Sequence, residues 1–163
     1  MPDIDKVEAW LKTKDVTVLR FAEATPTSAT AAAAIGCTPA EIAKSILFIV
    51  GGAPALVVTS GDMKVRSGQL KQALGRSGKV RLPAGDEVRD LTGYLPGGVC
   101  PFLLPQELTV VVDRSLQRFA TVYPAAGDDH SGVPVTPEQL RELCGGQWVE
   151  VCQPLFEEAA IDG

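Results

Sequence analysis

The chain has 163 residues, of which 45% are hydrophobic, and a formal net charge of -5 at pH 7. This length and composition fit a single domain, residues 1–163, that buries a core of its own. The negative balance argues against a protein that holds nucleic acid through its overall charge, which leaves only a local basic surface for such a role.

The cysteines and the single histidine limit metal chemistry. None of the four cysteines lies in a C-x-x-C pair, and His130 supplies too few partners for an ordinary zinc site. We therefore expect no metal, no other cofactor, and separate reduced thiols in a cytoplasmic protein. The N-terminus has no basic region, and no stretch approaches the roughly 18 apolar residues of a membrane helix, so neither export nor membrane insertion is indicated.

The first part of the chain predicts two helices and a strand. Apolar residues at three- and four-residue spacing indicate an amphipathic helix over Ile4–Leu11. The alternating segment Val16–Phe21 predicts a strand. The alanine-rich segment Ser28–Ile35 predicts a helix that stops at Gly36, because glycine readily adopts the left-handed conformation of a helix end.

A capping signal then precedes a buried strand. Thr38, with proline after it and Glu41 three residues later, predicts the start of a short helix. The apolar segment Ser45–Val50 predicts a strand, so Lys44 lies at the junction of the two. Its charge fits either a solvated helix C-terminus or a fixed ammonium at the edge of a pocket, and the sequence leaves both open.

The later elements continue this alternation. Gly51–Pro54 predicts a hairpin turn into a second strand, Ala55–Thr59. Interspersed helices and strands without a repeat predict an α+β fold with a mixed, largely antiparallel sheet. Further strands are expected at Val80–Leu82, Leu108–Asp113, Phe119–Tyr123 and Trp148–Cys152, helices at Gln69–Leu74, at Asp86–Leu91 and after the cap Thr136, and an acidic tail over about 155–163.

Basic residues gather in one segment of this acidic chain. No acidic residue occurs between Asp62 and Asp86, whereas six of the fifteen basic residues lie there. The segment is either a solvated face or a local surface for an anionic partner. Its members are Lys64, Arg66, Lys71, Arg76, Lys79 and Arg81.

The segment Gly93–Phe102, Gly-Tyr-Leu-Pro-Gly-Gly-Val-Cys-Pro-Phe, predicts a shaped loop. Its prolines and glycines exclude a regular helix or strand, and its apolar residues are too many for an idle solvent loop. We expect it to fold against the core and to bare the backbone of Gly97 and Gly98. Free N–H groups there could hold a carbonyl oxygen, an oxyanion or a water; a well-packed turn is the alternative.

An ordered set of motifs resembles the YbaK/ProX family of aminoacyl-tRNA deacylases, which includes free-standing proteins and the editing insertion of bacterial prolyl-tRNA synthetases. The resemblance extends with similar spacing over about residues 25–151. It implies a barrel-like sheet flanked by helices, and hydrolysis of the ester between a wrong amino acid and its tRNA. The motifs are Glu41–Leu47, Thr92–Phe102, Val112–Asp113 and Phe119–Tyr123.

The resemblance also assigns roles to residues. Lys44 falls on the family's functional lysine, and Gly97 and Pro101 fall on its Gly-x-x-x-Pro loop. Two departures are a cysteine at position 100, where many relatives carry serine, and the unusually acidic loop Asp128–His130.

An aminoacyl ester is already activated, so its hydrolysis needs a placed water, a stabilised oxyanion and a grip on the terminal adenosine. We assign the oxyanion or the water to the backbone N–H groups of Gly97 and Gly98, and the terminal phosphate or carbonyl to Lys44. The six basic residues would bind the tRNA. The expected pocket walls are Ser45, Ile46, Val99, Cys100, Pro101 and Phe102.

The expected substrate is a small amino acid, alanine or cysteine, on a proline tRNA, with an aminoacyl-tRNA synthetase as a further candidate partner. A rival mechanism uses Cys100 as nucleophile and His130 as base, although no acid is obviously paired with that histidine. A different class of function is a binding domain that holds tRNA ends or a small acyl ligand without hydrolysis.

Overall fold

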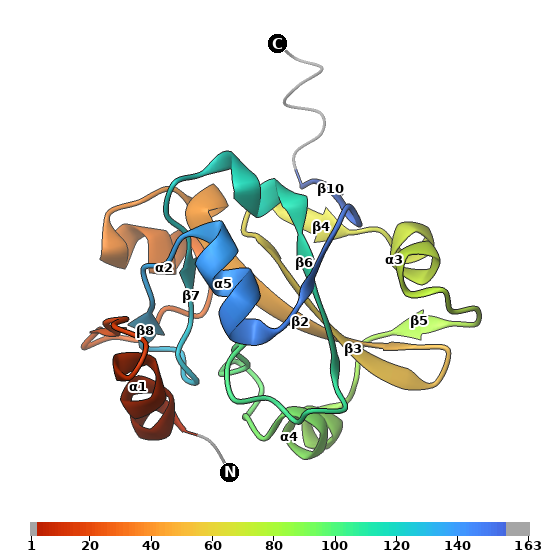
Figure 1. Cartoon of the computed structure of the whole chain (residues 1–163), viewed down its shortest axis with the longest axis horizontal. Helices are drawn as coiled ribbons and strands as arrows, with labels where there is room; N and C mark the ends of the chain where they lie inside the picture. Colours follow the sequence, from red (N-terminus) through yellow and green to blue (C-terminus); the bar gives the residue numbers. More distant parts are fainter. Residues whose placement is uncertain (1–2, 156–163) are drawn as a thin grey trace.

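The computed structural model describes residues 3–155, along which helices and strands alternate (Figure 1). The α-helices in this range are α1 Ile4–Lys12, α2 Ser28–Ile35, α3 Ser67–Leu74, α4 Gly85–Thr92 and α5 Pro137–Cys144. The strands are β1 Leu19–Arg20, β2 Ile42–Val50, β3 Ala53–Ser60, β4 Met63–Val65, β5 Val80–Arg81, β6 Thr109–Asp113, β7 Tyr123–Pro124, β8 Ser131–Gly132, β9 Gln147–Val149 and β10 Cys152–Pro154. The 3₁₀ helices are η1 Pro39–Glu41 and η2 Arg114–Arg118.

A six-stranded mixed sheet forms the centre of the molecule, in the order β5-β2-β3-β6-β9, and β7 also pairs with β2. β2 and β3 form a long antiparallel hairpin in which Ser45 lies opposite Val58. The pairings β3-β6, β6-β9 and β2-β7 are parallel, and β1-β8 and β4-β10 form two small antiparallel sheets. The expected α+β fold with a mixed sheet and flanking helices is confirmed; the described sheet is curved and open rather than closed.

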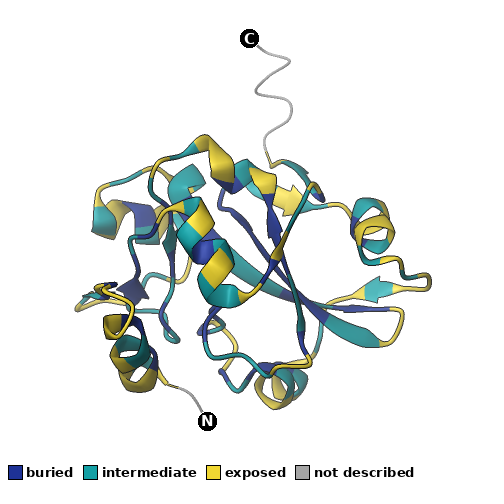
Figure 2. Ribbon diagram, viewed as in Figure 1, coloured by how far each residue is buried: buried dark blue, intermediate teal, exposed yellow. Residues whose placement is uncertain are grey.

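Apolar clusters cover both faces of this sheet, whose central strands β2, β3 and β6 are largely buried (Figure 2). Val58 belongs to the larger cluster and Val57 to the smaller one. Because successive side chains of a strand point to opposite faces, the two clusters lie on opposite sides of β3. Burial on both faces explains why β3 reads as an uninterrupted apolar run. Each fully buried valine or leucine contributes about 1.5–3 kcal/mol relative to exposure.

The capping signals of the sequence are confirmed. Gly36 ends α2 with a φ of 90°, and its N–H donates to the carbonyl of Ala32. Glu41 accepts from the backbone N–H of Thr38 at 2.9 Å. Thr136 caps α5 by accepting from the N–H of Gln139 at 3.1 Å. These short-range bonds satisfy N–H and carbonyl groups that a helix end leaves open.

Some predicted strands are shorter than expected or broken. The Val16–Phe21 prediction reduces to β1, because the N–H of Val16 donates to Leu11 and closes the end of α1. Phe119 ends η2, which leaves only Tyr123 of Phe119–Tyr123 in β7. The segment Trp148–Cys152 divides between β9 and β10, because the N–H of Val151 donates to the Asp113 carboxylate instead of to a strand.

The helix expected after Thr38 is one turn of 3₁₀ helix, and β2 begins at Ile42. Lys44 therefore lies inside a strand rather than at a helix end, which corrects the prediction of a junction. The acidic tail lies outside the described residues apart from Leu155. Within residues 3–155, every helix is too short or too polar to span a membrane.

Candidate functional site

The loop after α4 is built around a tight turn. The N–H of Gly98 donates to the carbonyl of Leu95 at 2.9 Å, with Pro96 and Gly97 between them. Gly97 has a φ of 87°. A type II turn needs this positive φ at its third residue and accepts proline at its second, so the sequence Pro-Gly fits the turn directly.

Gly98 has a different reason to be glycine. A Cβ atom at Gly98 would lie 2.9 Å from the carbonyl oxygen of Gly127, so the loop packs closely on that backbone. Gly98 is buried, and its N–H is already bonded within the turn. The predicted pair of bare N–H groups is therefore wrong for Gly98, and only Gly97 stays exposed.

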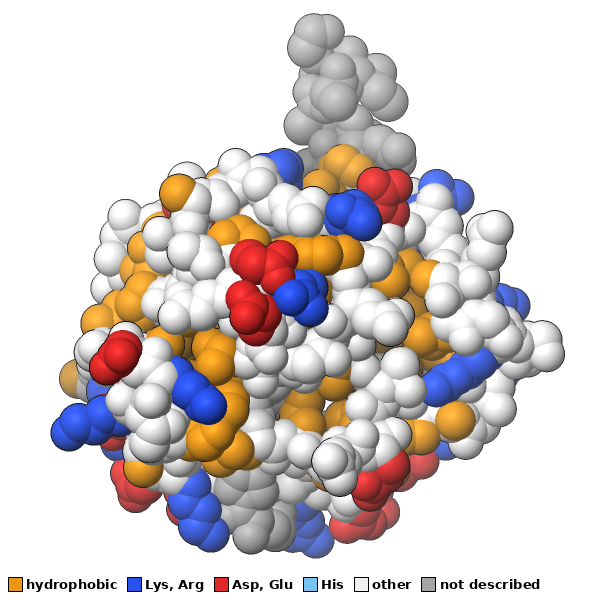
Figure 3. All heavy atoms as spheres, in the orientation of Figure 1, with side chains coloured by type: hydrophobic (Ala, Val, Ile, Leu, Met, Phe, Trp, Pro, Cys, Tyr) orange, Lys and Arg blue, Asp and Glu red, His pale blue; other side chains and the backbone are white. Residues whose placement is uncertain are grey.

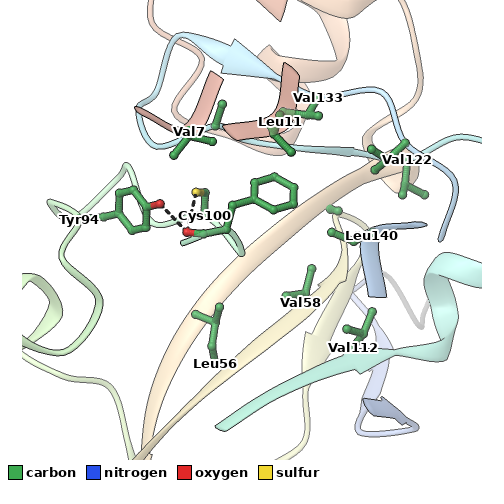
Figure 4. Packing of buried hydrophobic residues seen from close by; sticks show 14 of the residues in the cluster. Val7, Leu11, Leu56, Val58, Tyr94, Cys100, Val112, Val122, Val133 and Leu140 are labelled. Carbon is green, nitrogen blue, oxygen red and sulfur yellow. Dashed lines mark hydrogen bonds between the residues drawn. The ribbon is translucent and has the colours of Figure 1, made fainter. Parts of the chain in front are cut away.

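The second half of the loop is held in the core. The hydroxyl of Tyr94 donates to the carbonyl of Phe102 at 2.5 Å, and the sulfur of Cys100 lies 3.9 Å from the same oxygen (Figure 4). Cys100 and Phe102 are 0% exposed. The ring of Phe102 packs on Trp10 of α1, with ring centroids 6.0 Å apart. These contacts fix the loop against α1.

Because of this burial, three residues that were predicted to line the pocket do not line it. Cys100, Pro101 and Phe102 are buried behind the loop and do not line the cavity described below, so direct contact with a substrate is not supported. Burial also raises the pKa of Cys100 to about 12, which keeps the thiol protonated. A protonated, buried thiol is a poor nucleophile, so the rival Cys100 mechanism is not supported.

A partly open cavity of about 380 Å³ lies beside the Gly97 turn. Four of the predicted site residues line it: Lys44, Ser45, Gly97 and Val99. Ile46 does not line it. The rest of its wall comes from α2 and the segment before it, from the start of β2, from β7, and from β8 and the loop before it: Thr25, Pro26, Thr27, Ser28, Ala31, Ile35, Ile42, Ala43, Tyr123, Ala125, Asp128, Asp129 and Ser131.

Ser45 lines this cavity and carries an unsatisfied polar group. By strand alternation Ser45 shares a face with Ala43 and Leu47, both in the larger apolar cluster. Its Oγ is buried and has no hydrogen-bond partner within the described residues. A buried hydroxyl without a hydrogen-bond partner costs free energy of folding. A ligand that bonds to this hydroxyl would recover that cost as binding free energy.

Lys44 lines the cavity, but its ammonium is engaged elsewhere. The Nζ atom donates to the carbonyl of Met63 at 2.5 Å. Lys44 lies opposite Thr59 in the hairpin, on the strand face away from Ser45. Burial lowers the pKa of Lys44, while the nearby Cys152 and Asp62 act in the opposite direction. In this state the ammonium does not need a substrate as its partner.

The acidic loop before β8 is a part of the site that the sequence did not assign. Asp128 and Asp129 both line the cavity. The carbonyl of Asp129 accepts from the N–H of Thr25 at 2.6 Å, which ties the loop to the start of α2. The sequence feature that could have indicated this loop is the pair of adjacent aspartates beside the single histidine of the chain.

His130 does have an acidic partner, contrary to the sequence expectation. Its Nδ1 lies 2.6 Å from Oδ1 of Asp129, and its backbone N–H donates to Asp128 at 2.9 Å. These bonds orient the two carboxylates.

The basic segment is less available than its sequence suggests. Arg76 donates to the carbonyls of Val50, Ala53 and Pro54 at 3.5, 3.0 and 3.3 Å. Arg81 forms two 2.9 Å hydrogen bonds with Glu87. Both guanidinium groups therefore have structural roles, which argues against their assignment to tRNA. On the face shown in Figure 3, basic side chains are scattered among uncharged ones and form no continuous patch.

The other four members remain candidates for an anionic partner. Lys64, Arg66 and Lys79 are exposed, and Lys71 is half-buried. None of these four side chains forms an ion pair within residues 3–155.

The model of the aminoacyl-tRNA editing domain family matches residues 22–143 of this chain. The chain is 38% identical over 146 residues to YwhH of Bacillus subtilis, an uncharacterized protein, and the match covers 88% of this chain and 90% of YwhH. It is 31% identical over 117 residues to a proline–tRNA ligase of Aquifex aeolicus, covering 71% of this chain but only 20% of the ligase.

A solved structure extends this likeness to the fold. A candidate trans-editing enzyme for prolyl-tRNA synthetase superposes with a TM-score of 0.84 at 28% identity, over 94% of this chain and 98% of that one. The match therefore includes the sheet and nearly all of the elements that surround the cavity.

Proposed function

The chain belongs to the aminoacyl-tRNA editing domain family and is an aminoacyl-tRNA deacylase, and we propose that it acts in trans on a small amino acid, alanine or cysteine, esterified to a proline tRNA. The observation that carries this proposal is the buried, unpartnered hydroxyl of Ser45, a residue on the wall of a cavity that Gly97 and two aspartates also line. The likeness to a proline–tRNA ligase and to a candidate trans-editing enzyme supports the choice of tRNA.

The cavity suits a small aminoacyl group. Its apolar wall comes from short or branched side chains, Ala31, Ala43, Val99 and Ala125 among them. The cavity is partly open, so the ester can enter while the rest of the tRNA stays outside. One methylene in an apolar pocket changes discrimination by about 1–3 kcal/mol, so the wall residues set the preference among small amino acids.

Two hydrogen-bond donors face the reacting ester in this proposal. The Gly97 N–H has no backbone acceptor within the described residues, and the Ser45 hydroxyl is unsatisfied. Water attacks the ester carbonyl carbon, and the donors stabilise the oxyanion that forms. The bond to the ribose oxygen then breaks. A ribose hydroxyl of the substrate relays the proton of the water, so free amino acid and tRNA leave.

The carboxylates suit the one cation of the substrate. An aminoacyl ester carries an α-ammonium group, and Asp128 and Asp129 line the cavity where that group would lie. A charge-assisted hydrogen bond to a carboxylate is about twice as strong as a neutral one. The acidic loop thus favours an amino acid ester over an uncharged acyl group.

Lys44 is proposed to bind the tRNA part of the ester, which leaves when the ester bond breaks. Its ammonium would exchange the Met63 carbonyl for a substrate oxygen or the terminal phosphate when the tRNA binds. The mischarged tRNA comes from the prolyl-tRNA synthetase, which makes that enzyme the candidate protein partner.

The decisive experiment presents a panel of proline tRNAs charged with alanine, cysteine, serine or proline and measures released amino acid. We expect multiple turnover with alanine or cysteine and sparing of the proline ester. Ser45→Ala should lower the rate by about 10²-fold, because it removes one oxyanion donor. The matched control is Ser67→Ala, an exposed serine on α3 that does not line the cavity.

The alternative function predicts a different result. A binding domain would protect the esters stoichiometrically without releasing amino acid, and that outcome would contradict the proposed hydrolysis. An equal rate in Ser45→Ala and the wild type would remove the Ser45 hydroxyl from the mechanism.

A further inference from the structure

A second hollow lies next to the first and shares its wall. It measures about 510 Å³ and is lined by residues of α4, of the Leu95–Gly98 turn and of the acidic loop. Gly97, Asp128 and Asp129 line both hollows. A group covalently joined to an ester in the first cavity can therefore reach the second by crossing the Gly97 turn.

The turn gives this hollow an apolar surface. Leu95 is 63% exposed, one of the few large hydrophobic side chains of the described residues that face solvent. Pro96 beside it is also exposed, and Tyr94 forms the floor with its hydroxyl already bonded to Phe102. Apolar and aromatic surfaces of this kind hold the flat face of a nucleobase.

Arg89 gives the hollow a cation without an acidic partner. It lies in the last turn of α4, is exposed, and forms no ion pair within residues 3–155. None of the three carboxylates that line the hollow forms an ion pair with Arg89. Asp3 caps α1 by accepting from the backbone N–H of Lys6 at 3.0 Å, Asp128 accepts from the backbone N–H of His130, and Asp129 contacts the His130 ring. A free guanidinium is well shaped for the two oxygens of a phosphate.

We propose that this second hollow is the subsite for the terminal adenosine of the tRNA. The base lies against Leu95 and Pro96, and the 5′-phosphate of that nucleotide pairs with Arg89. The ribose then spans the Gly97 turn and places its aminoacyl ester in the first cavity. This inference rests on the proposed function, because it takes the ester to be the group bound beside Ser45.

The test separates base from phosphate with two small substrates: alanine esterified to the ribose of adenosine, and the same ester on AMP. Arg89→Ala should raise KM for the AMP ester about 10-fold and leave the adenosine ester unchanged. Leu95→Ser should raise KM for both. The control is Lys12→Ala, an exposed cation that lines neither hollow and should change neither KM.

A binding measurement makes the subsite testable apart from turnover. AMP alone should shift the methyl resonances of Leu95 in the wild type and shift them far less in Arg89→Ala. Equal losses on both esters in Arg89→Ala would mean a structural role for Arg89, and an unmoved Leu95 would place AMP elsewhere; either result overturns the inference. AMP binding at Leu95 without hydrolysis of any ester would contradict the proposed function and leave the subsite standing.

Discussion

At the scale of single residues, neighbours in the chain have unlike roles. Gly97 is glycine because a turn needs its positive φ, whereas Gly98 is glycine because another backbone lies against it. Lys44 and Ser45 are adjacent on β2 but belong to opposite faces of the sheet. Of these two side chains, only Ser45 has a buried polar atom without a hydrogen-bond partner within the described residues.

Lys44→Ala and Cys100→Ser form a matched pair of residue tests. Lys44→Ala should lower deacylation of mischarged tRNA by about 10²-fold, if its ammonium stabilises developing negative charge as one preorganised donor does. Cys100→Ser should keep most of the wild-type turnover, because the thiol is buried outside the cavity. Single-turnover rates on one mischarged tRNA measure both.

Undiminished activity in Lys44→Ala would remove Lys44 from the mechanism. Complete loss of activity in a folded Cys100→Ser protein would reinstate the thiol as a candidate nucleophile.

At the scale of elements, α4 shows how a helix start is held by a side chain that the sequence pattern did not single out. Glu87 accepts from the N–H of Ala84 at 2.8 Å and also binds Arg81 of β5. These contacts fix the start of α4, which carries Arg89 and leads into the Gly97 turn. The ion pair thus links β5 to the helix that positions the loop.

The Glu87 contacts predict a pH dependence. The hydrogen bond from Arg81, followed by that from the Ala84 N–H, lowers the pKa of Glu87 to about 2. A carboxylate with a lowered pKa stabilises the fold above its ordinary pKa, and this contribution is lost as the pH falls from about 4.5 to about 2. Glu87→Gln should therefore be less stable than the wild type at pH 7 and equally stable near pH 2.

Urea unfolding at pH 7, 4 and 2 measures this difference. Glu107→Gln, an exposed carboxylate outside α4, is the control. A gap between wild type and Glu87→Gln that stays constant down to pH 2 would show that the charge of Glu87 is not responsible.

At the scale of the whole molecule, the acidic chain has to bind an anionic tRNA through few cations. Arg76 and Arg81 belong to the fold, so the four remaining basic residues of the segment are the candidates. On the face in Figure 3 the basic side chains form no continuous patch.

Substitutions at two positions separate the roles of the basic residues. Lys79→Ala should weaken tRNA affinity and reduce the slope of log K against log salt concentration by about 1, because one phosphate contact is lost. Arg76→Ala should instead lower the free energy of unfolding by about 1–3 kcal/mol, since three carbonyls lose a donor. Salt-dependent tRNA binding and urea unfolding, measured on both variants, distinguish the two roles. Unchanged tRNA affinity in Lys79→Ala would indicate that the basic segment is only a solvated face.

The sequence by itself determined the features that depend on near neighbours. The caps at Gly36, Thr38 and Thr136, the β2-β3 hairpin and the tight turn in the Gly93–Phe102 loop follow from a few adjacent residues. The ordered motifs also indicated the family. Such signals act over one turn or one strand pair, so they are visible without the rest of the chain.

Only the tertiary structure decided which groups meet and which are free. It placed Asp128 and Asp129 on the wall of the cavity that Ser45 also lines, and it used the N–H of Gly98 within its own turn. It also turned Arg76 inward and buried Cys100. These outcomes depend on strand register and on packing between segments far apart in the sequence, where one shift of register would change every partner.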